Sequence, residues 1–589
     1  MSMISRRSFL KGTGVVAGAL ALTACGGSSS STAPASSAAG TTDFSAVLAE
    51  FDAGAANLAD WANKFDTIID KVRTETDFAK RADLMHEAED VLMSTWALMP
   101  IYFYTDMYLQ KDYVTGVQNN VFGMKRFMYA KNTNNPDQLN ICLASEPDYT
   151  DPRLSTSVDG GCLASNMFLG VMTLGADGNP IPGCAESYTV SDDGTVYTFT
   201  MKDGLKWSDG EALTAADFVY SWNTCVDPNT GCDYGYLFDV VAKNDDGTVK
   251  AEASADGKTL TVTLISPCPY FLDLCAFPTF YPVPKAHVEA ANTDGTQPGK
   301  WAQEAGFVTN GAYTMTAWNH NESLTLSANP NFVDAANVTM PKLNFMLSAD
   351  TTAIHTAYLN GDLDFADSVP TEEVETQKKG TELKIDPQLG TAYTCANVNS
   401  PLFTEGRTAQ QAIALRKALT LQIDRDYIVE TITQGGQVPA NCFIPKGCAD
   451  GNGGIFYETT TYTYPVASAK GYFDPAADNS EEIANLLQAA GLTLVDGMVD
   501  QAATPFTFEY LTNPGGGNIA IAEAQQQDFA ALGIEMGIAQ QEWAVMLDSR
   551  KNGDYDVSRN AWVMDYNDPI NMLEMWLTDS GNNDAQFGK

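Results

Sequence analysis

The chain has 589 residues and a strong excess of acidic side chains. Asp and Glu number 74 against 34 Lys and Arg, which gives a formal net charge of −40. The acids are dispersed along the sequence, and such a field repels phosphate backbones, so the composition argues against nucleic-acid binding. A dispersed excess is otherwise typical of a solvated surface. The length allows about two to four domains with cores of their own.

The first residues indicate export. Residues 5–11 read SRRSFLK, the twin-arginine export pattern, and an apolar run follows at Val15–Leu22. That run is too short to span a bilayer. It leads into the sequence LTACG, which resembles the lipobox of bacterial lipoproteins. The resemblance implies a leader at 1–25, with a lipid attached to the sulfur of Cys25 as a membrane tether.

A spacer separates this leader from the first helical pattern. Residues 28–42, within the expected spacer 26–59, are mostly Ser, Ala, Gly and Thr, a flexible composition. No later stretch has eighteen consecutive apolar residues, so we expect no transmembrane helix. The expected location is extracytoplasmic, on the outer face of the cell membrane or in the periplasm. An uncleaved anchor would leave that location unchanged.

Ten cysteines follow Cys25, and an even number in an exported chain suggests disulfides. Three pairs are close enough in sequence to close local loops: Cys225 with Cys232, Cys268 with Cys275, and Cys442 with Cys448. None has the CxxC spacing of a redox or zinc site. Buried free thiols are the alternative, and the sequence does not choose between the two.

The region before residue 145 alternates helical and extended patterns. Apolar residues recur with a helical period over 65–72 and 82–92, and Thr76 and Asp77 are candidates for the start of the second helix. The patterns after these helices are, in order, a buried strand at Leu98–Tyr104, an Asn-rich break with a proline at 131–137, and a strand at 138–144.

Residues 186–222, ESYTVSDDGTVYTFTMKDGLKWSDGEALTAADFVYSW, form the most specific stretch. Two alternating strands flank the Asp193-Gly194 turn, and Thr214 is placed to cap a helix. This run closely resembles the motif of family 5 solute-binding proteins of ABC importers, the peptide, dipeptide and nickel-binding group. The likeness continues at GAY (311–313), ANP (328–330), YLNGDLD (358–364), LRKALTLQIDRD (415–426) and NLLQAAG (485–491), with a family-like opening at Leu139–Leu154.

The resemblance implies an α/β, two-lobed periplasmic-binding-protein-like fold with an extra third domain and a hinge between the lobes. The segments that cross between the lobes would lie near Asp106 and near Leu389–Gly390. The implied divisions after the spacer are 60–105 and 390–589 for the second lobe, 106–168 and 293–389 for the first, and 169–292 for the extra domain. The implied function is capture of oligopeptides between closing lobes and delivery to a membrane permease, by a monomer without cofactor.

One departure from the family concerns chain order. Family members end with a helix, an apolar strand containing Met-Pro and a short final strand, and here that pattern stands at Thr76–Ala130, ahead of the family's usual start. We therefore expect a circular permutant with the former termini joined near 131–137, because chain termini tend to be close in space. A rearranged gene product is the alternative, but it does not explain a leader and spacer that run in frame into this segment.

The candidate site is centred on Glu542–Trp576, which combines tryptophans, arginines and acids. Residues 555–563 alternate as a half-buried strand does, and Asp565 follows in a DYNDP turn. A carboxylate pairs with an ammonium, an arginine with a carboxylate, and indoles provide apolar walls, so the set suits a zwitterionic ligand. A core strand with surface charges is the structural alternative.

The resemblance assigns roles to individual residues. Asp565 would pair with the peptide α-ammonium. Trp543 and Trp562 would line side-chain pockets, and Arg550 and Arg559 would lie near the peptide's C-terminal half. The other assignments are Tyr234 (or Tyr236) from the other lobe, backbone contacts by strands at Val158 and Gly390–Tyr393, and, more weakly, Asp367. Two family features are missing: the sequence at 514–518 is PGGGN, without a histidine, and Thr156 stands where an acid is usual.

An enzyme is the main competing class. The sequence has no G-x-S-x-G or HExxH motif, and its four histidines (His86, His287, His320 and His355) are scattered without metal-ligand spacing. We expect no enzymatic activity and no metal site. Carriers of dipeptides, of nickel chelates or of another small solute, and a sensor without transport, stay open as alternatives, although Asp565 favours an amine-bearing ligand.

Overall fold

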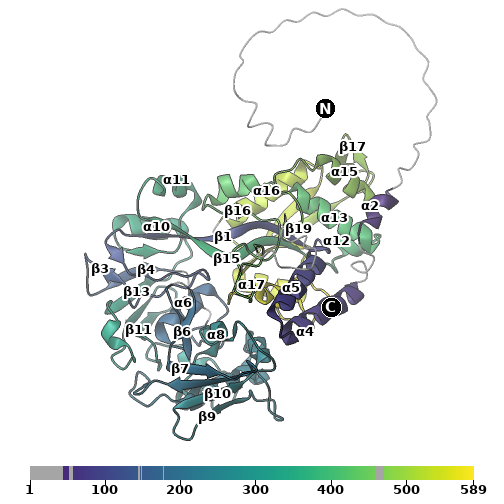
Figure 1. Cartoon of the computed structure of the whole chain (residues 1–589). Coiled ribbons are helices and arrows are strands. Elements are labelled where there is room, and N and C mark those ends of the chain that lie inside the picture. The colour runs from purple at the N-terminus through teal and green to yellow at the C-terminus, as the bar shows by residue number, and fades with distance from the viewer. Residues whose placement is uncertain are drawn as a thin grey trace, which may run out of the picture.

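A computed structural model describes residues 44–51, 58–143, 146–147, 149–176, 178–458, 470–515 and 517–589. The leader, with Cys25, and most of the spacer lie outside the described residues. Within the described residues the largest sheet has 11 strands and runs through the whole body (Figure 1). Its order is β11 (Tyr313–Asn319), β12 (Ser323–Ala328), β13 (Lys342–Met346), β4 (Leu139–Cys142), β14 (Phe365–Ala366), β1 (Leu98–Gln110), β15 (Leu383–Ala396), β21 (Val557–Val563), β19 (Thr507–Thr512) and β20 (Glu535–Gln540), with β16 (Val438–Pro439) on β1.

Two long antiparallel strands, β1 and β15, join the two halves of this sheet. Their pairing extends from Leu98 opposite Cys395 to Leu109 opposite Leu383, with register shifts on either side of Tyr102–Phe103. The end of β1 pairs with β14, whereas the last residues of β15 pair with β21. The segments expected to cross between the lobes, near Asp106 and Leu389–Gly390, lie in these two strands. We call the half from β11 to β14 the first lobe and the half from β21 to β20 the second lobe.

The first lobe carries a separate four-stranded sheet, β7 (Ala185–Val190), β8 (Val196–Met201), β10 (Thr259–Thr263) and β9 (Ala251–Ala253). The predicted hairpin is confirmed: β7 and β8 flank a turn in which Gly194 has φ +70°, a conformation that favours glycine. The predicted helix is α7 (Ala215–Val226), and Thr214 and Asp217 form its capping box. Other helices of this lobe are α6 (Val158–Met167), α8 (Phe271–Leu274), α9 (Lys285–Ala291), α10 (Thr351–Asn360) and α11 (Val374–Gln377).

The second lobe combines early and late segments of the chain. The expected early helices are α4 (Leu58–Thr74) and α5 (Phe78–Met93), and the side chain of Asp77 caps α5 as predicted. Both helices contact α18 (Ile570–Leu573). The remaining helices are α2 (Ser45–Ala49), α12 (Pro401–Thr404), α13 (Ala409–Gln422), α14 (Arg425–Tyr427), α15 (Ser480–Ala489), α16 (Asn518–Ala530) and α17 (Trp543–Asn552). Short strand pairs complete the fold: β2 (Val114–Thr115) with β3 (Lys131–Asn132), β5 (Met172–Leu174) with β6 (Pro180–Pro182), and β17 (Leu494–Val495) with β18 (Met498–Val499).

A buried ion pair fixes the early helices to the late segment. The guanidinium of Arg81 on α5 makes two hydrogen bonds of 2.8 Å to the carboxylate of Asp568, and both side chains are almost fully buried. Arg73 on α4, which is partly exposed, makes a single hydrogen bond of 2.9 Å to Glu574. The bidentate geometry of the Arg81–Asp568 pair compensates the cost of burying its two charges. The helices α4 and α5 are therefore an integral part of the second lobe.

Three negative findings concern the described residues alone. No helix among them is long and apolar enough to cross a membrane. No cluster of His, Cys, Asp and Glu with metal-binding geometry occurs there. The ten cysteines that follow the leader all fall within the described part, and each is a free thiol in this structure.

Replacing Arg81 tests the integration of the early helices. Arg81→Ala leaves the Asp568 carboxylate buried without its partner, so we expect a loss of about 3 to 5 kcal/mol in the free energy of unfolding. Urea denaturation followed by circular dichroism measures this. Lys80→Ala is the control, because the Lys80–Asp77 pair is exposed, and such pairs contribute about 1 kcal/mol or less. Equal effects of the two variants would contradict the structural role of the buried pair.

Candidate functional site

Asp565 lies two residues beyond the end of β21, which confirms the predicted strand and turn. Its carboxylate accepts hydrogen bonds from the Tyr234 hydroxyl (3.0 Å) and from the Asn571 side-chain amide (3.2 Å). The Asn571 carbonyl oxygen in turn accepts the backbone N–H of Asp565 (3.1 Å) and the indole N–H of Trp562 (3.0 Å). Asn571, on α18, therefore fixes the orientation of both predicted site residues.

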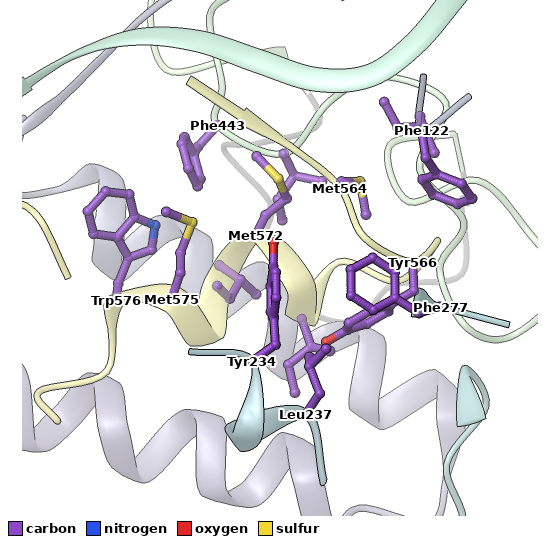
Figure 2. Close-up of a cluster of buried hydrophobic side chains, with 14 of the residues drawn as sticks. Phe122, Tyr234, Leu237, Phe277, Phe443, Met564, Tyr566, Met572, Met575 and Trp576 are labelled. Atoms are coloured by element: carbon purple, nitrogen blue, oxygen red, sulfur yellow. The ribbon is translucent and has the colours of Figure 1, made fainter. Parts of the chain in front are cut away.

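The Tyr234–Asp565 hydrogen bond joins the two lobes. Tyr234 precedes the 3₁₀ helix η2 (Gly235–Val240) beside the small sheet, whereas Asp565 belongs to the second lobe. Tyr270 stacks on Tyr566 across the same junction, with ring centroids 4.5 Å apart and an angle of 9° between the ring planes. Figure 2 shows Tyr234 beside Met572, in a buried cluster to which both lobes contribute. The structure therefore holds the lobes in contact at the site.

Asp565 is a partly buried carboxylate whose hydrogen-bond partners are uncharged. Burial raises its pKa to about 7, and the charge of Glu574 acts in the same direction. The hydrogen bonds from Asn571 and Tyr234 lower the pKa, but they only partly offset the burial. Among the ion pairs of the described residues, none involves Asp565. A partly buried carboxylate of this kind is stabilised by a cation brought from outside.

Trp543 and the two predicted arginines form a second group. Trp543 begins α17 and is 45% exposed. The guanidinium carbons of Arg550 and Arg559 lie 5.6 and 5.7 Å from the centre of its ring, within the range of a cation–π contact. Arg550 is buried and also pairs with Asp584 at 3.3 Å, so its charge is compensated within the protein. Arg559 is more exposed, and it is the arginine better placed to meet a ligand.

The predicted backbone contacts require correction. Val158 was expected on a strand, but it is the first residue of α6, whose N-terminus is capped by Ser157. Tyr393 is paired with β1 on one side and with β21 on the other, so its backbone forms no free strand edge. Its ring is buried in the core of the second lobe, 5.1 Å from Phe443 and 6.0 Å from Trp576. Neither residue therefore offers an unpaired strand to a ligand.

Asp367 lies away from this group and has its own cation. Its carboxylate is 2.9 Å from the buried ammonium of Lys125, which also lies 2.8 Å from Asp106 on β1. Burial raises the pKa of Asp367 to about 7, and the charge of Lys125 opposes this effect. Asp367 is thus part of an internal charge network close to the crossing strands, in contrast to Asp565.

Sequence reasoning missed the residues that hold Asp565 in place. Asn571 is an ordinary polar residue six positions downstream of Asp565, and only the Pro569 turn brings it back. The signal that could have indicated it is the proline at the start of a short helix directly after an acidic turn. Asp568, which in sequence looks like a neighbouring surface acid, is instead the buried partner of Arg81.

Comparison with known proteins identifies the family of the chain. The profile of the bacterial extracellular solute-binding proteins, family 5, matches residues 179–584. The chain belongs to this family. A twin-arginine translocation signal profile matches residues 3–23, which confirms the predicted export signal. The protein is thus an exported solute-binding protein and not an enzyme.

Individual relatives match over most of the chain. The chain is 33% identical over 476 residues to the oligopeptide-binding protein OppA of Bacillus subtilis, covering 77% of this chain and 80% of the relative. It is 32% identical over 460 residues to the periplasmic OppA of Salmonella typhimurium, covering 75% and 78%. Among solved structures, Haemophilus influenzae OppA in complex with the peptide RPPGFSPFR has a TM-score of 0.63 and 26% identity, covering 77% of this chain and 85% of that one. The murein tripeptide binding protein MppA of Escherichia coli has a TM-score of 0.64 and 27% identity, with coverage of 77% and 84%.

The raised pKa of Asp565 predicts a pH-dependent shape for the ligand-free protein. Burial at the junction of the lobes raises this pKa from an ordinary 3.8 to about 7, although the hydrogen bond from Tyr234 acts the other way. Because of this rise, the contacting form binds the proton more tightly than a form in which the carboxyl group meets water. The contacting form is therefore favoured at low pH and loses up to about 4 kcal/mol of this advantage as the pH rises from 4 through 7. We expect the radius of gyration from small-angle X-ray scattering to increase between pH 5 and pH 8.

Two variants make this measurement specific. Asp565→Asn removes the titrating group and should keep the lobes together at all these pH values. Asp548→Asn, which changes an exposed carboxylate on α17, should titrate like the parent protein. A radius of gyration of the parent protein that does not change with pH would contradict the assignment.

Proposed function

We propose that this protein captures oligopeptides between its two lobes and delivers them to the permease of an ABC importer. The observation that carries the proposal is the partly buried Asp565 carboxylate, which has only neutral partners and sits where the lobes meet. Every peptide with a free N-terminus presents an α-ammonium, the cation that this carboxylate lacks. The names of relatives support a peptide ligand, since OppA of B. subtilis and of S. typhimurium are both named oligopeptide-binding.

The other site residues fit an extended zwitterionic ligand. The exposed face of Trp543 offers a flat apolar wall, and Arg559 beside it offers a cation for a carboxylate of the ligand. Arg550 would act indirectly, because its ion pair with Asp584 holds its guanidinium beside the same indole. Trp562 would be positioned by Asn571 beside the anchor. Val158, Tyr393 and Asp367 would support the fold around the site rather than contact the ligand.

Capture would depend on a hinge in the crossing strands. The register shifts in β1 on both sides of Tyr102–Phe103 interrupt its pairing with β15, and bulges of this kind are points where a strand bends. Closure would bring Tyr234 onto Asp565 and Tyr270 onto Tyr566, and a ligand that prefers the closed form would shift the equilibrium toward it. The closed form would then present one joint surface of both lobes to the permease.

The location and assembly complete the proposal. After export, lipid on Cys25 would tether the monomer to the membrane, and the spacer would let the folded body reach the permease. The alternative is a carrier of dipeptides, of a nickel chelate or of another small solute. A dipeptide is the more specific alternative, because one relative, from Lactococcus lactis and 30% identical, is named a dipeptide-binding protein.

Substitution of Asp565 tests the proposed function. Asp565→Asn would leave the ligand ammonium buried without a counter-charge, which costs about 2 to 5 kcal/mol, or roughly 30- to 4,000-fold in Kd. Titration calorimetry with a pool of tri- to hexapeptides on refolded, ligand-free protein measures this loss. N-acetylation of the pool should weaken binding to the parent protein by a similar factor and have little effect on the variant.

The matched control is Asp548→Asn, an exposed carboxylate of the same lobe. Asp568 is unsuitable as a control, because its substitution would break the buried pair with Arg81. Equal losses at Asp565 and Asp548 would contradict the anchor assignment. Native mass spectrometry of the protein as purified should show bound masses that fragment as peptides, and bound nickel or a non-peptide solute would instead favour the alternative.

We also propose that the chain order is circularly permuted relative to the family. Supporting this, Phe587 contacts Trp61 at the start of α4, with ring centroids 4.1 Å apart. A Cβ added at Gly588 would lie 2.9 Å from that of Ala62. The late segment thus lies against the start of α4, as Figure 1 also shows, and a short connection could join them. The expected former termini, near 131–137, fall in an exposed turn between β3 and β4.

A reordered chain tests the permutation. We would begin the chain at Asn134, join Lys589 to Asp60 through a short Gly-Ser linker, and end it at Thr133. This order keeps every strand intact, so we expect a urea midpoint and a peptide Kd within about twofold of the parent protein. A control with the same junction, opened instead between Asp106 and Met107, interrupts β1 and should not fold. Failure of the first chain to fold would contradict the proposal.

A further inference from the structure

The loop that carries Tyr234 contains two cysteines. Cys225 lies in the last turn of α7, and Cys232 stands two residues before Tyr234. Both line a cavity of about 410 Å³ between α7 and η2, which Tyr236 and Asp239 also line. Cys225 is buried, whereas Cys232 is partly exposed to solvent.

The backbone around these cysteines brings the two residues together. Burial, together with the nearby Cys232 thiol, raises the pKa of the Cys225 thiol. In this structure the Cys225 thiol donates to the carbonyl oxygen of Thr279 (3.6 Å) and the Cys232 thiol to that of Arg153 (2.9 Å). Gly235 fixes both ends of the loop: its N–H donates to the carbonyl oxygen of Cys232 at 2.9 Å, and a Cβ at Gly235 would come within 2.9 Å of the carbonyl oxygen of Cys225. Gly231, with φ +65°, reverses the chain between them. The loop therefore already holds the two cysteines close to each other at the wall of one cavity.

The two other cysteine pairs that are close in sequence are buried. The thiols of Cys442 and Cys448 each donate to a main-chain carbonyl, of Ile444 and Ala449 respectively, as those of Cys225 and Cys232 also do. Cys268 and Cys275 flank α8, and both are buried. Of the three pairs, only Cys225 with Cys232 has a member that is partly exposed to solvent and open to attack by an external disulfide.

We propose that Cys225 and Cys232 form a disulfide after export, and that this bond locks the loop presenting Tyr234 to the second lobe. The export signal takes the chain to a compartment in which disulfides persist. The oxidant would be a disulfide donor, either a small-molecule disulfide or a thiol–disulfide oxidoreductase.

The exchange is balanced in two steps. The thiolate of the more exposed Cys232 attacks one sulfur of the donor disulfide, and the other donor sulfur leaves as a thiolate. Cys225 then loses its proton, and its sulfur attacks that of Cys232 and releases the second donor sulfur. The two cysteines lose two electrons and two protons in total, and the donor disulfide becomes two thiols.

Locking the loop has a consequence at the candidate site. Tyr234 is two residues from Cys232 and donates to Asp565 across the lobes. A disulfide would restrict the loop before the lobes close, so the loop would lose less conformational entropy when Tyr234 meets Asp565. This second part of the inference rests on the proposed function, whereas the disulfide itself does not.

Peptide mapping of the exported, full-length protein decides on the disulfide. The protein is denatured in iodoacetamide without reductant and digested with trypsin, which leaves both cysteines in one peptide, Trp207–Lys243. We expect this peptide without alkylation and lacking two hydrogen atoms. Thr259–Lys285, which contains Cys268 and Cys275, is the internal control and should be alkylated twice. Double alkylation of Trp207–Lys243, even after incubation with oxidised glutathione, would overturn the proposal.

Two further measurements test the effect on the loop. Reduction with dithiothreitol should increase amide hydrogen exchange at residues 231–236 and speed peptide dissociation by at least about threefold. The double variant Cys225→Ser/Cys232→Ser should behave like the reduced protein and ignore dithiothreitol. If the disulfide is found but its reduction changes neither amide hydrogen exchange at residues 231–236 nor the rate of peptide dissociation, the proposed locking role is wrong and the disulfide itself stands. Absence of any peptide binding would count against the proposed function and leave the mapped disulfide standing.

Discussion

The pairing of β1 with β15 is the constraint on which the rest of the structure depends. These two strands are the shared members of both halves of the large sheet, so each lobe builds its remaining strands outward from them. β1 comes from the early part of the chain and β15 from its middle, and the pairing is therefore of long range in sequence. Such contacts form only after a large loop has closed, which makes the crossing pair costly in chain entropy. The burial of α4 and α5 against α18 stabilises the same arrangement.

Some carboxylates in this protein are compensated by a cation, and others, such as Glu89 and Asp565, have only uncharged partners. Arg81 with Asp568, and Lys125 with Asp106 and Asp367, are compensated inside the protein at distances of 2.8 to 2.9 Å. These groups fasten elements that are distant in sequence. Asp565 is only partly buried, and it has only a phenol and an amide as side-chain partners. An uncompensated carboxylate costs free energy in a folded protein, and a ligand that brings a cation to the lobe junction would remove that cost at Asp565.

Local patterns predicted local structure well, and they failed where tertiary contacts decide. The hairpin around Gly194, the capped helix after Thr214 and the strand leading to Asp565 are each determined by residues close in sequence. Val158 was misassigned to a strand, because Ser157 and the Gly-Gly that follows supply a helix start that the resemblance did not include. The roles of Arg550 and Asp367 depend on Asp584 and Lys125, partners that no spacing rule could identify. Asn571, the residue that orients the anchor, gives no signal of its own in the sequence.

The net charge of −40 bears on how such a site could select its ligand. At physiological salt the field of exposed acids is screened within about 8 Å, so it contributes little inside a closed junction. Within that junction the local balance matters: a peptide would bring one cation to Asp565 and one anion toward Arg559, and the protein would bury both charges without changing its total. If the protein recognises the two charged ends of the peptide, the side chains of the peptide contact only the exposed face of Trp543 and water, which can fill the remaining space. Broad acceptance of side chains together with strict dependence on the free N-terminus is therefore the selectivity expected from this geometry, and the N-acetylated pool measures it directly.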